Sequence, residues 1–483
     1  MSMPHECKAQ SVLPPAKQPQ DALAAISAQS SAHPLAYTYL EELADGIGAR
    51  LTGSEQAARS SRWALNKMRS IGLQNVHLEG WELHQSWQRG HAHAELSSPI
   101  SRPLTVTSLG WSGSTRQARS AELIAVDRNA TLQELQAASA QWNGKILFLI
   151  SRPDARRDDV VTLARLGPLV DSAIAASALA VITGDDNIEG AGMALRHTGP
   201  VSFLSRTYSI PVLDMVREDR KQIERFLQQG KRVRVQLDVQ NTISRGAVEA
   251  ENVVGEIPGT EDAEEIVLVG AHLDSWDLAQ GATDDGAGVA AVLSAAKAMI
   301  DSHSKPRRTI RFVLFSGEEQ GLMGSRAYVR QHDQELTRHV CSLIIDLGQG
   351  RITGIQLAGH DELRPMWMAF AQQVKHIADL EINNLQILFT DAYPFTLAGL
   401  PGITFAQLSP DYGAIHHSNA DTLDKIDATV LANDAELIAL ASFWIADYPL
   451  RLPGRWSKEK VAEMLTAHKQ QELLESLGLW PVN

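Results

Sequence analysis

Residues 264–274 read EEIVLVGAHLD, and the stretch from Ile266 to Ala271 is apolar without interruption. A strand exposed on one face alternates apolar and polar residues, so this pattern indicates a strand covered on both faces. Two more short apolar runs follow, in RTIRFVLFSGEE (308–319) and CSLIIDLGQG (341–350). We therefore expect three buried strands of this kind in the second half of the chain.

Helical patterns lie between these strands. The segment 286–303 reads GAGVAAVLSAAKAMIDSH, and its apolar residues recur on one face of a helix, among them Val289, Val292 and Ala296. A second expected helix lies in GSRAYVRQHDQE (324–335). Buried strands that alternate with helices predict an α/β fold, with a mostly parallel central sheet and helices on both faces.

The first half of the chain has a different texture. Ser54 is expected to cap a helix that Gly72 ends. Between residues 118 and 245, short apolar segments such as GKILFLI (144–150) and KRVRVQLDV (231–239) are broken by turns. Because no cluster of metal-binding or nucleophilic residue types lies there, we interpret 118–245 as a separate small β-rich domain.

Composition excludes several functions. The 483 residues carry a net charge of −13, which argues against a nucleic-acid partner because such a partner needs a basic face. No apolar run is long enough to predict a membrane span. The two cysteines, Cys7 and Cys341, are too far apart along the chain to suggest a disulfide framework or a sulfur-ligated metal site.

Metal-binding residue types follow each of the three buried strands. The first strand leads to His272 and Asp274, the second to Glu318 and Glu319, and the third to Asp346. In open α/β sheets ligands bind at the carboxyl ends of the strands, so these side chains are expected to lie together. Histidine and carboxylate ligands without cysteine suit zinc.

Two further segments carry the same residue types. The turn after the first strand holds Asp284 and Asp285, and a later segment holds His416, His417 and Asp421. Each motif alone is weak, because acidic pairs are usually solvated turns or surface faces. Carboxylates gathered at buried strand ends would be costly without cations, so their joint occurrence favours a metal site. One carboxylate shared between two His–carboxylate pairs would make the site co-catalytic.

Four segments together carry a resemblance to a known family: HLDSWDLAQGATDDGAG (272–288), SGEEQGLMGSRAY (316–328), IIDLGQG (344–350) and AIHHSNADT (414–422). They resemble the di-zinc exopeptidases that include bacterial leucyl aminopeptidases and plasma glutamate carboxypeptidase, also called carboxypeptidase Q. The pattern is most similar to carboxypeptidase Q, and it extends to GARLTGSE (48–55) near the start. The combined motifs are specific for the family and much less specific for the substrate.

The resemblance implies two zinc ions per chain. His272 and Asp346 would hold one ion, Glu319 and His417 would hold the other, and Asp284 would bridge both. The implied activity is hydrolysis of short unblocked peptides by metal-activated water.

The resemblance also implies roles around these ligands. Glu318 would be the general base, and Asp274 would orient the nearest histidine. His417, four residues before Asp421, is the match to the family histidine rather than His416. The resemblance also implies a cis peptide bond between Asp284 and Asp285.

The resemblance divides the chain as follows. Residues 34–117 and 246–450 would form the catalytic domain, 118–245 would be an inserted protease-associated domain, and 451–483 would be a C-terminal helical extension. Residues 1–33, rich in Pro, Gln, Ser and Ala, are expected to be flexible. A homodimer and a secreted or periplasmic location are implied. The N-terminal residues show no signal-peptide core, so a cytoplasmic location stays open.

One departure from the family pattern concerns the group that stabilises the oxyanion. Some relatives have a tyrosine shortly before a Ser-Asp pair, whereas this chain has Thr390 and Asp391 with no tyrosine before them. Tyr393 and Tyr412 lie nearby, and the sequence assigns neither. Trp276 could line the substrate pocket or pack in the core.

Two other functions fit the same fold. One is a catalytically inactive, receptor-like binding module, and the other is an enzyme similar to glutaminyl cyclases. The complete set of ligands and the retained base disfavour both. The metal ligands do not separate an aminopeptidase from a dipeptidase, because pocket shape and charge make that choice.

Overall fold

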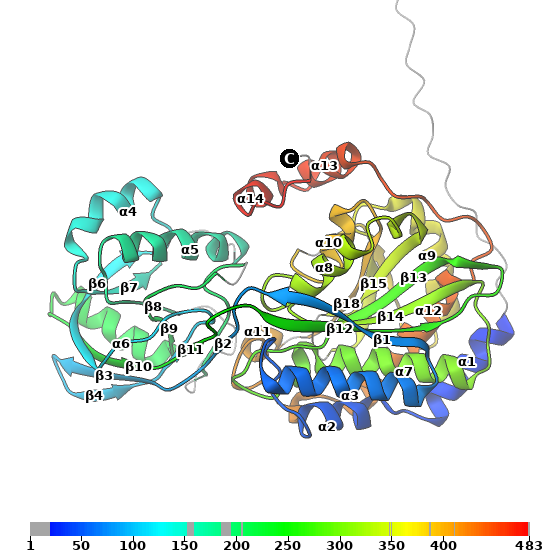
Figure 1. Ribbon diagram of the computed structural model, residues 1–483, viewed down its shortest axis with the longest axis horizontal. Helices are drawn as coiled ribbons and strands as arrows, with labels where there is room; N and C mark the ends of the chain where they lie inside the picture. Colours follow the sequence, from blue (N-terminus) through cyan, green and yellow to red (C-terminus); the bar gives the residue numbers. More distant parts are fainter. Residues whose placement is uncertain are drawn as a thin grey trace, which may run out of the picture.

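Two eight-stranded sheets build two lobes that lie side by side (Figure 1). The structure is a computed structural model that describes residues 20–151, 159–184, 195–203, 206–346, 348, 350–385, 388–409 and 411–481. A two-stranded ladder of β2 (Trp87–Gln88) and β11 (Thr242–Ile243) lies between the lobes.

The first lobe is built on a mixed sheet. Its central strands β14, β13, β15 and β18 run parallel to one another, whereas β12 and β1 on one side and β16 on the other pair antiparallel. In spatial order the strands are β1 (Gln74–Leu83), β12 (Val248–Ile257), β14 (Arg308–Phe315), β13 (Asp262–His272), β15 (His339–Ile344), β18 (Gly402–Gln407), β16 (Ile352–Gln356) and β17 (Glu381–Asn383).

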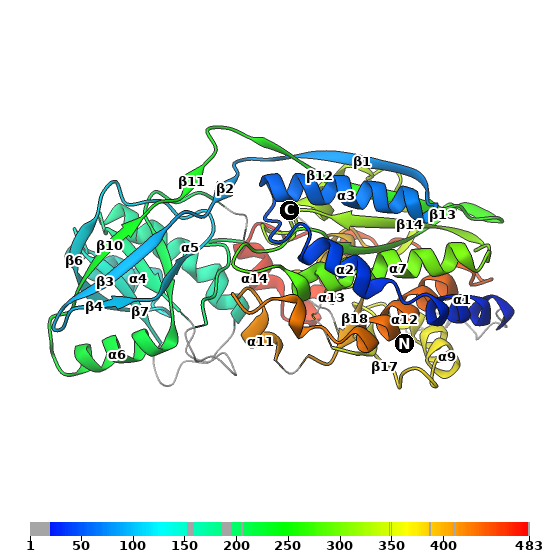
Figure 2. The ribbon, with the colours of Figure 1, turned by 90° about the horizontal axis from the view of Figure 1, so that it is seen from below.

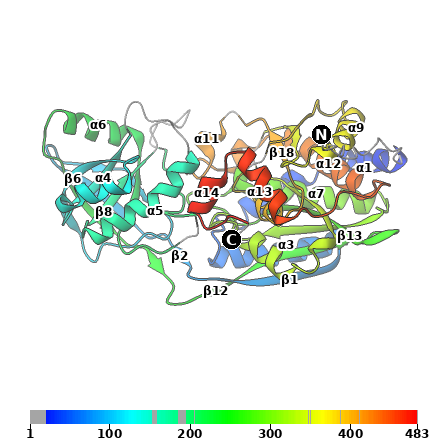
Figure 3. The same ribbon diagram turned by 90° about the horizontal axis from the view of Figure 1, so that it is seen from above.

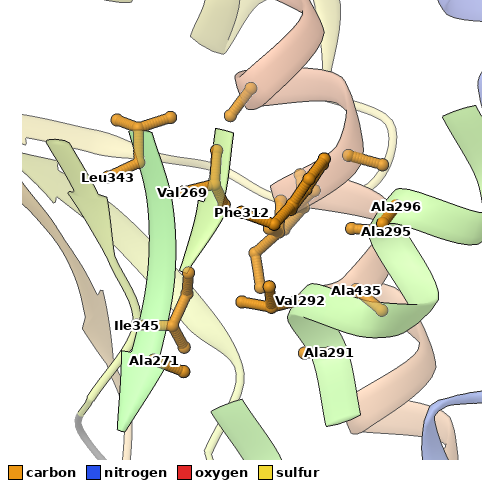
Figure 4. Close-up of a cluster of buried hydrophobic side chains, with 14 of the residues drawn as sticks. Val269, Ala271, Ala291, Val292, Ala295, Ala296, Phe312, Leu343, Ile345 and Ala435 are labelled. Atoms are coloured by element: carbon orange, nitrogen blue, oxygen red, sulfur yellow. The ribbon is translucent and has the colours of Figure 1, made fainter. Parts of the chain in front are cut away.

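Helices cover one face of this sheet in the layer seen from below in Figure 2. The closest are α7 (Ala287–Asp301) and α12 (Ala428–Ala446), and Val292 of α7 lies near Val269 and Phe312 of the sheet (Figure 4). The same face also carries α2 (Ala36–Ala44), α3 (Glu55–Ile71) and α9 (Arg364–Gln373).

The opposite face of the sheet is covered by α8 (Met323–Gln331) and α10 (Tyr393–Leu397). Successive residues of a strand point to opposite faces, so Val269 packs under α7 while Leu268 packs on this side. Both faces of β13 are therefore buried. The predicted α/β fold with helices on both faces is confirmed, with antiparallel strands at both edges.

The expected flexible N-terminus is wrong for part of its length. Residues 1–19 lie outside the described residues, but α1 (Gln20–Ala32) is a helix that packs against α7 and α12. Its Ile26 is fully buried, and Ala22 and Leu23 pack on the same core. Ala22 and Leu23 each lie one helical turn before Ile26, so the three side chains share the face that packs on the core.

The second lobe begins earlier than the expected boundary at residue 118. Its β3 pairs with β10 and its β5 pairs with β9, so residues from 92 onward belong to it. In spatial order its strands are β4 (Arg102–Leu104), β3 (Ala92–Ser98), β10 (Arg234–Val239), β6 (Arg119–Asp127), β7 (Ile146–Ile150), β8 (Ala180–Thr183), β9 (Val212–Met215) and β5 (Val106–Ser108). Its helices are α4 (Leu132–Ala138), α5 (Asp159–Ala175) and α6 (Arg217–Gln228).

The C-terminal helices α13 (Lys458–Ala467) and α14 (Gln471–Ser476) lie over the boundary between the lobes (Figures 1 and 3). Their Leu465 packs in one cluster with Tyr393 of the first lobe and Phe203 of the second. The extension therefore touches both lobes.

Only α12, among the residues that the structure describes, is long and apolar enough to cross a membrane. Of its apolar window, 72% is buried inside the protein, as is usual for a core helix.

Candidate metal centre

The predicted site residues meet at one edge of the first sheet. His272 ends β13, Glu318 and Glu319 follow β14, and Asp346 follows β15, so all four come from the carboxyl ends of parallel strands. The turn between β13 and α7 adds Asp284. The histidines come from the end of the short helix α11 (Tyr412–Ile415).

Asp284 lies between two histidines. Its Oδ1 is 3.0 Å from Nε2 of His272, and its Oδ2 is 3.3 Å from Nε2 of His417. Asp346 Oδ1 lies 3.5 Å from the same nitrogen of His272. Glu319 Oε2 lies 2.9 Å from His417. The five residues predicted as ligands are thus brought together as two His–carboxylate pairs around one shared aspartate.

These spacings suit ligands of a common cation. Zinc bound tetrahedrally at about 2.0–2.1 Å keeps its ligand atoms roughly 3.3 Å apart, close to the distances around Asp284. Glu319 Oε1 is buried and has no hydrogen-bond partner among the described residues, as expected for an oxygen that a metal ion would satisfy. The residues present therefore fit zinc.

The electrostatics of the cluster point the same way. Burial, and then the charge of Asp284, raise the pKa of Glu319 well above its ordinary value. Burial lowers the pKa of His272, but the charge of Asp346 and hydrogen bonds to neighbouring carboxylates outweigh it and raise that pKa well above normal. Because carboxylates outnumber histidines, ionising every carboxyl group would leave excess negative charge, which bound dications would neutralise.

Asp274 supports the site partly through its main chain. His272 Nδ1 lies 3.0 Å from the carbonyl oxygen of Asp274 and 3.7 Å from its carboxylate. The carboxylate instead accepts hydrogen bonds from the backbone N–H of Glu318 (3.2 Å) and from the hydroxyl of Thr52 (2.9 Å). Asp274 therefore also fixes the backbone of the residue predicted as the general base.

Three buried residues that the sequence analysis did not assign hold the turns in place. Asp421 accepts from the backbone N–H groups of Thr283 (2.6 Å) and Asp284 (3.2 Å). Asp285 accepts from the backbone N–H of His272 (3.3 Å), and its peptide bond to the preceding residue is cis, as the resemblance implies.

The third such residue, Arg50, is fully buried and donates to the carbonyl oxygens of Leu273 (2.7 Å), Gln280 (2.7 Å) and Gly281 (3.0 Å). Its segment, GARLTGSE, was part of the family resemblance, but nothing local in it indicates which carbonyl groups Arg50 contacts. The only indication in the sequence is that Arg50 is a charged residue next to a turn.

His416 also lies beside the cluster. Its Nε2 is 3.6 Å from Asp284 Oδ2, and its ring stacks on His417 with the ring centroids 3.6 Å apart. Burial and the charge of His417 lower the pKa of His416 to about 4. His417 is the histidine that also contacts Glu319, which favours it as the ligand of that pair.

The two tyrosines that the sequence leaves unassigned lie in different surroundings. The hydroxyl of Tyr393 lies 3.4 Å from Gln470, within the apolar cluster under the C-terminal helices. The ring of Tyr412 packs on His416 at 4.8 Å, beside the metal-binding residue types. Asp391 is fully buried, and burial raises its pKa to about 8.

Trp276 packs between the His417 ring and the second lobe. It is 5% exposed, and its ring meets His417 edge-on at 5.8 Å and Trp111 of the second lobe at 6.4 Å.

Comparison with known proteins identifies the family. The family model of peptidase family M28 matches residues 252–442, the range that contains all five predicted ligands. Carboxypeptidase Q of Mus musculus is 29% identical over 423 residues, which are 86% of this chain and 87% of the mouse protein. Carboxypeptidase Q of Bos taurus is 29% identical over 422 residues, with 86% of each chain covered.

Solved structures agree with this assignment. A zinc aminopeptidase from Bacillus subtilis has the same fold, with 21% identity, a TM-score of 0.66 and coverage of 92% of this chain and 99% of that one. The peptidase M28 precursor from Shewanella amazonensis SB2B is 32% identical and covers 91% of this chain and 99% of its own, with a TM-score of 0.77. At this identity over nearly the whole of both chains, the likeness shows that this chain belongs to peptidase family M28 and is a metallopeptidase.

Proposed function

We propose that the chain is a two-zinc exopeptidase that hydrolyses short unblocked peptides, either as a dipeptidase or as an aminopeptidase. The observation that carries the proposal is the position of Asp284, whose two carboxylate oxygens face His272 and His417 separately. Such a carboxylate can bridge two metal ions, whereas a single-metal site needs no shared ligand.

The ligand assignment follows from the same contacts. His272 and Asp346 would hold one zinc ion, Glu319 and His417 would hold the other, and Asp284 would hold both. Bound zinc lowers the pKa of a coordinated water to about 7 and polarises a carbonyl group.

Glu318 is the residue proposed to take the proton of that water and to return one to the leaving amine. Glu318 and Glu319 lie in the turn after β14, where Glu319 contacts His417 and the backbone of Glu318 is held by Asp274, so the two glutamates can serve different roles. Thr52 and Asp274 fix the backbone where the chain enters this pair, because Thr52 Oγ1 accepts from the N–H of Gly317 at 2.9 Å and Asp274 accepts from the N–H of Glu318 at 3.2 Å. The base is thus held by two groups that would not touch the metal ions.

The names of the relatives support the substrate class. Carboxypeptidase Q is the name of several similar chains, and the Bacillus subtilis structure is described as a zinc aminopeptidase. In this chain, the second lobe contacts the His417 loop, which would limit access for long peptides. As the resemblance implies, we propose that this lobe is a protease-associated domain, that the enzyme is a homodimer, and that it is secreted or periplasmic.

The test is a panel of unblocked, N-acetylated and C-amidated di- and tripeptides, assayed with metal-free protein and after addition of one or two zinc equivalents. We expect that unblocked dipeptides are cleaved and that cleavage requires both zinc equivalents. Preference for N-acetylated peptides or cleavage within long chains would contradict the exopeptidase assignment. Cyclisation of N-terminal glutamine with one zinc equivalent would favour the cyclase alternative, and zinc binding without any turnover would favour the binding module.

A further inference from the structure

A short segment of the second lobe pairs with the loop that carries His417. The backbone N–H of Thr198 donates to the carbonyl oxygen of His417 at 2.9 Å. Arg196 and Asn419 are joined twice, through Asn419 N–H to Arg196 O (3.0 Å) and Arg196 N–H to Asn419 Oδ1 (2.7 Å). An antiparallel bridge between His197 and Ser418 lies at the centre of this pairing.

The backbone at His417 needs such support. Its φ is +54°, a left-handed conformation that residues other than glycine adopt rarely. This backbone conformation sets the direction of the His417 imidazole, which contacts Glu319 and Asp284. If the loop relaxed, the imidazole would turn away from both carboxylates.

An ion pair between Arg89, just after β2, and Asp277 of the first lobe holds the pairing segment in place. The guanidinium of Arg89 binds both carboxylate oxygens of Asp277, at 2.6 and 2.9 Å, in the geometry of a bidentate pair. The same guanidinium donates to Thr198 Oγ1 (2.9 Å) and to the carbonyl oxygen of Ser108. The side chains of Arg89 and Asp277 are only 14% and 19% exposed, so solvent screens this pair weakly.

Packing beside the ion pair links the same elements. Trp276 lies next to Asp277 in the chain, and its ring sits between Trp111 and His417. A Cβ atom at Gly110 would lie 2.5 Å from the Trp276 ring, so only glycine allows this approach. The second lobe therefore contacts the ring of His417 through Trp276 and its backbone through Thr198.

Within the part of the chain that the structure describes, the His272 half of the site is held from the first lobe. His272 ends β13, and its backbone N–H and ring are held by Asp285 and Asp274 of the first lobe. The two proposed zinc positions are thus supported by different parts of the molecule.

We propose that Arg89 and Asp277 are positioning residues that hold the segment Arg196–Thr198 of the second lobe against the His417 loop. The zinc position formed by His417 and Glu319 depends on this contact. The position formed by His272 and Asp346 does not. The proposal rests on the two-zinc function proposed above. It gives the second lobe a role in building the metal centre as well as in covering it.

The test is zinc binding to metal-free protein, measured by competition with a chromogenic chelator. Wild-type protein should bind two equivalents. In Arg89→Met, one of the two equivalents should lose about 10–100-fold in affinity, the size expected when a supporting partner of a metal ligand is removed, while the other equivalent is unchanged. Turnover should recover when zinc is added in excess.

Two further variants make the result interpretable. Thr198→Val keeps the shape of the side chain and removes the hydroxyl that Arg89 contacts, so it should weaken the same equivalent by a smaller factor. Arg102→Met breaks a comparable pair within the second lobe, between Arg102 and Asp219 at 2.6 Å, far from the His417 loop. It should leave both zinc affinities unchanged.

Unchanged binding of both equivalents in folded Arg89→Met would overturn the proposal, as would equal loss of both equivalents or the same loss in Arg102→Met. Near-ultraviolet circular dichroism of the metal-free proteins checks the fold, and Thr198→Val carries the test if Arg89→Met does not fold. Fewer than two equivalents in the wild type would instead contradict the two-zinc function itself.

Discussion

The Asp421 carboxylate accepts a hydrogen bond from the backbone N–H of Asp284 at 3.2 Å, and a second one from the preceding residue at 2.6 Å. These are contacts to backbone groups, and they fix the main chain of the residue proposed to bridge two zinc ions. Asp421 is 5% exposed, and this burial raises its pKa to about 6.

Asp421→Asn should therefore weaken zinc binding without removing a ligand. An amide offers one acceptor where the carboxylate offers two, and its NH₂ group faces a backbone donor. We expect a loss of about 10–100-fold in zinc affinity, with turnover partly recovered by added zinc. Asp427→Asn is the matched control, because Asp427 also accepts from two backbone N–H groups, at the start of α12. Equal zinc affinities in the two variants would argue against the role of Asp421.

Substitution of the adjacent glutamates should separate their roles. Glu318→Gln should keep both zinc equivalents and lose at least about 10²–10⁴-fold in kcat, because the proposed general base is removed. Glu319→Gln should lose affinity for one equivalent, because Glu319 contacts His417. Metal analysis and steady-state kinetics on the same preparations check both results. Loss of metal from Glu318→Gln and not from Glu319→Gln would reverse the assignment.

The sequence predicted the parts of the fold that depend on local pattern. The expected strands in 264–274, 308–319 and 341–350 correspond to β13, β14 and β15. Each contains a short apolar run (266–271, 312–315 and 343–345) because helices cover both faces, and the ligand types stand where the strands end. The helix from Ser54 to Gly72 is also as expected, with a cap from Ser54 to the N–H of Ala57.

Features that depend on distant pairing could not be predicted in this way. The alternating pattern of β3 fits either sheet, and only its pairing with β10 places it in the second lobe. Arg50 and Asp421 act on backbone groups of distant turns, so no side-chain motif marks their partners. The contact between Thr198 and His417 likewise joins segments whose local sequences show no relation.

Stability should depend on pH through His332, away from the metal centre. Burial lowers the pKa of His332, but hydrogen bonds to Glu79 (3.0 Å) and Glu335 (2.8 Å) outweigh it and raise the pKa above 6.5. A raised pKa in the folded state stabilises the fold fully below the unfolded value, and this contribution is lost as the pH rises through the folded value.

His332→Gln should therefore cost about 1–3 kcal/mol in the free energy of unfolding near pH 5.5, the usual value of charge-assisted hydrogen bonds, and clearly less near pH 9. Urea unfolding of metal-free protein at both pH values measures the difference. The exposed His303→Gln serves as control and should show a small effect at either pH. A cost for His332→Gln that grows with pH would contradict the charged state inferred for His332.

Arg50 should matter more for stability than any exposed arginine of the first lobe. Its guanidinium is fully buried and donates to three carbonyl oxygens of the loop between His272 and Asp284. In Arg50→Met all three oxygens lose the guanidinium donor, although the Gly281 oxygen still accepts from the backbone N–H of Gly286. The carboxylates of Asp421 and Asp274 also lose a nearby positive charge. We expect a cost of about 3–5 kcal/mol in the free energy of unfolding. Arg59→Met, at an exposed position, should cost less than about 0.5 kcal/mol.

Because the same loop carries the proposed ligands, zinc should restore less stability to Arg50→Met than to the wild type at equal concentration, as weaker binding shifts the unfolding equilibrium less. Urea unfolding with and without zinc measures both effects, and equal stability of the two arginine variants would show that the loop keeps its shape without Arg50.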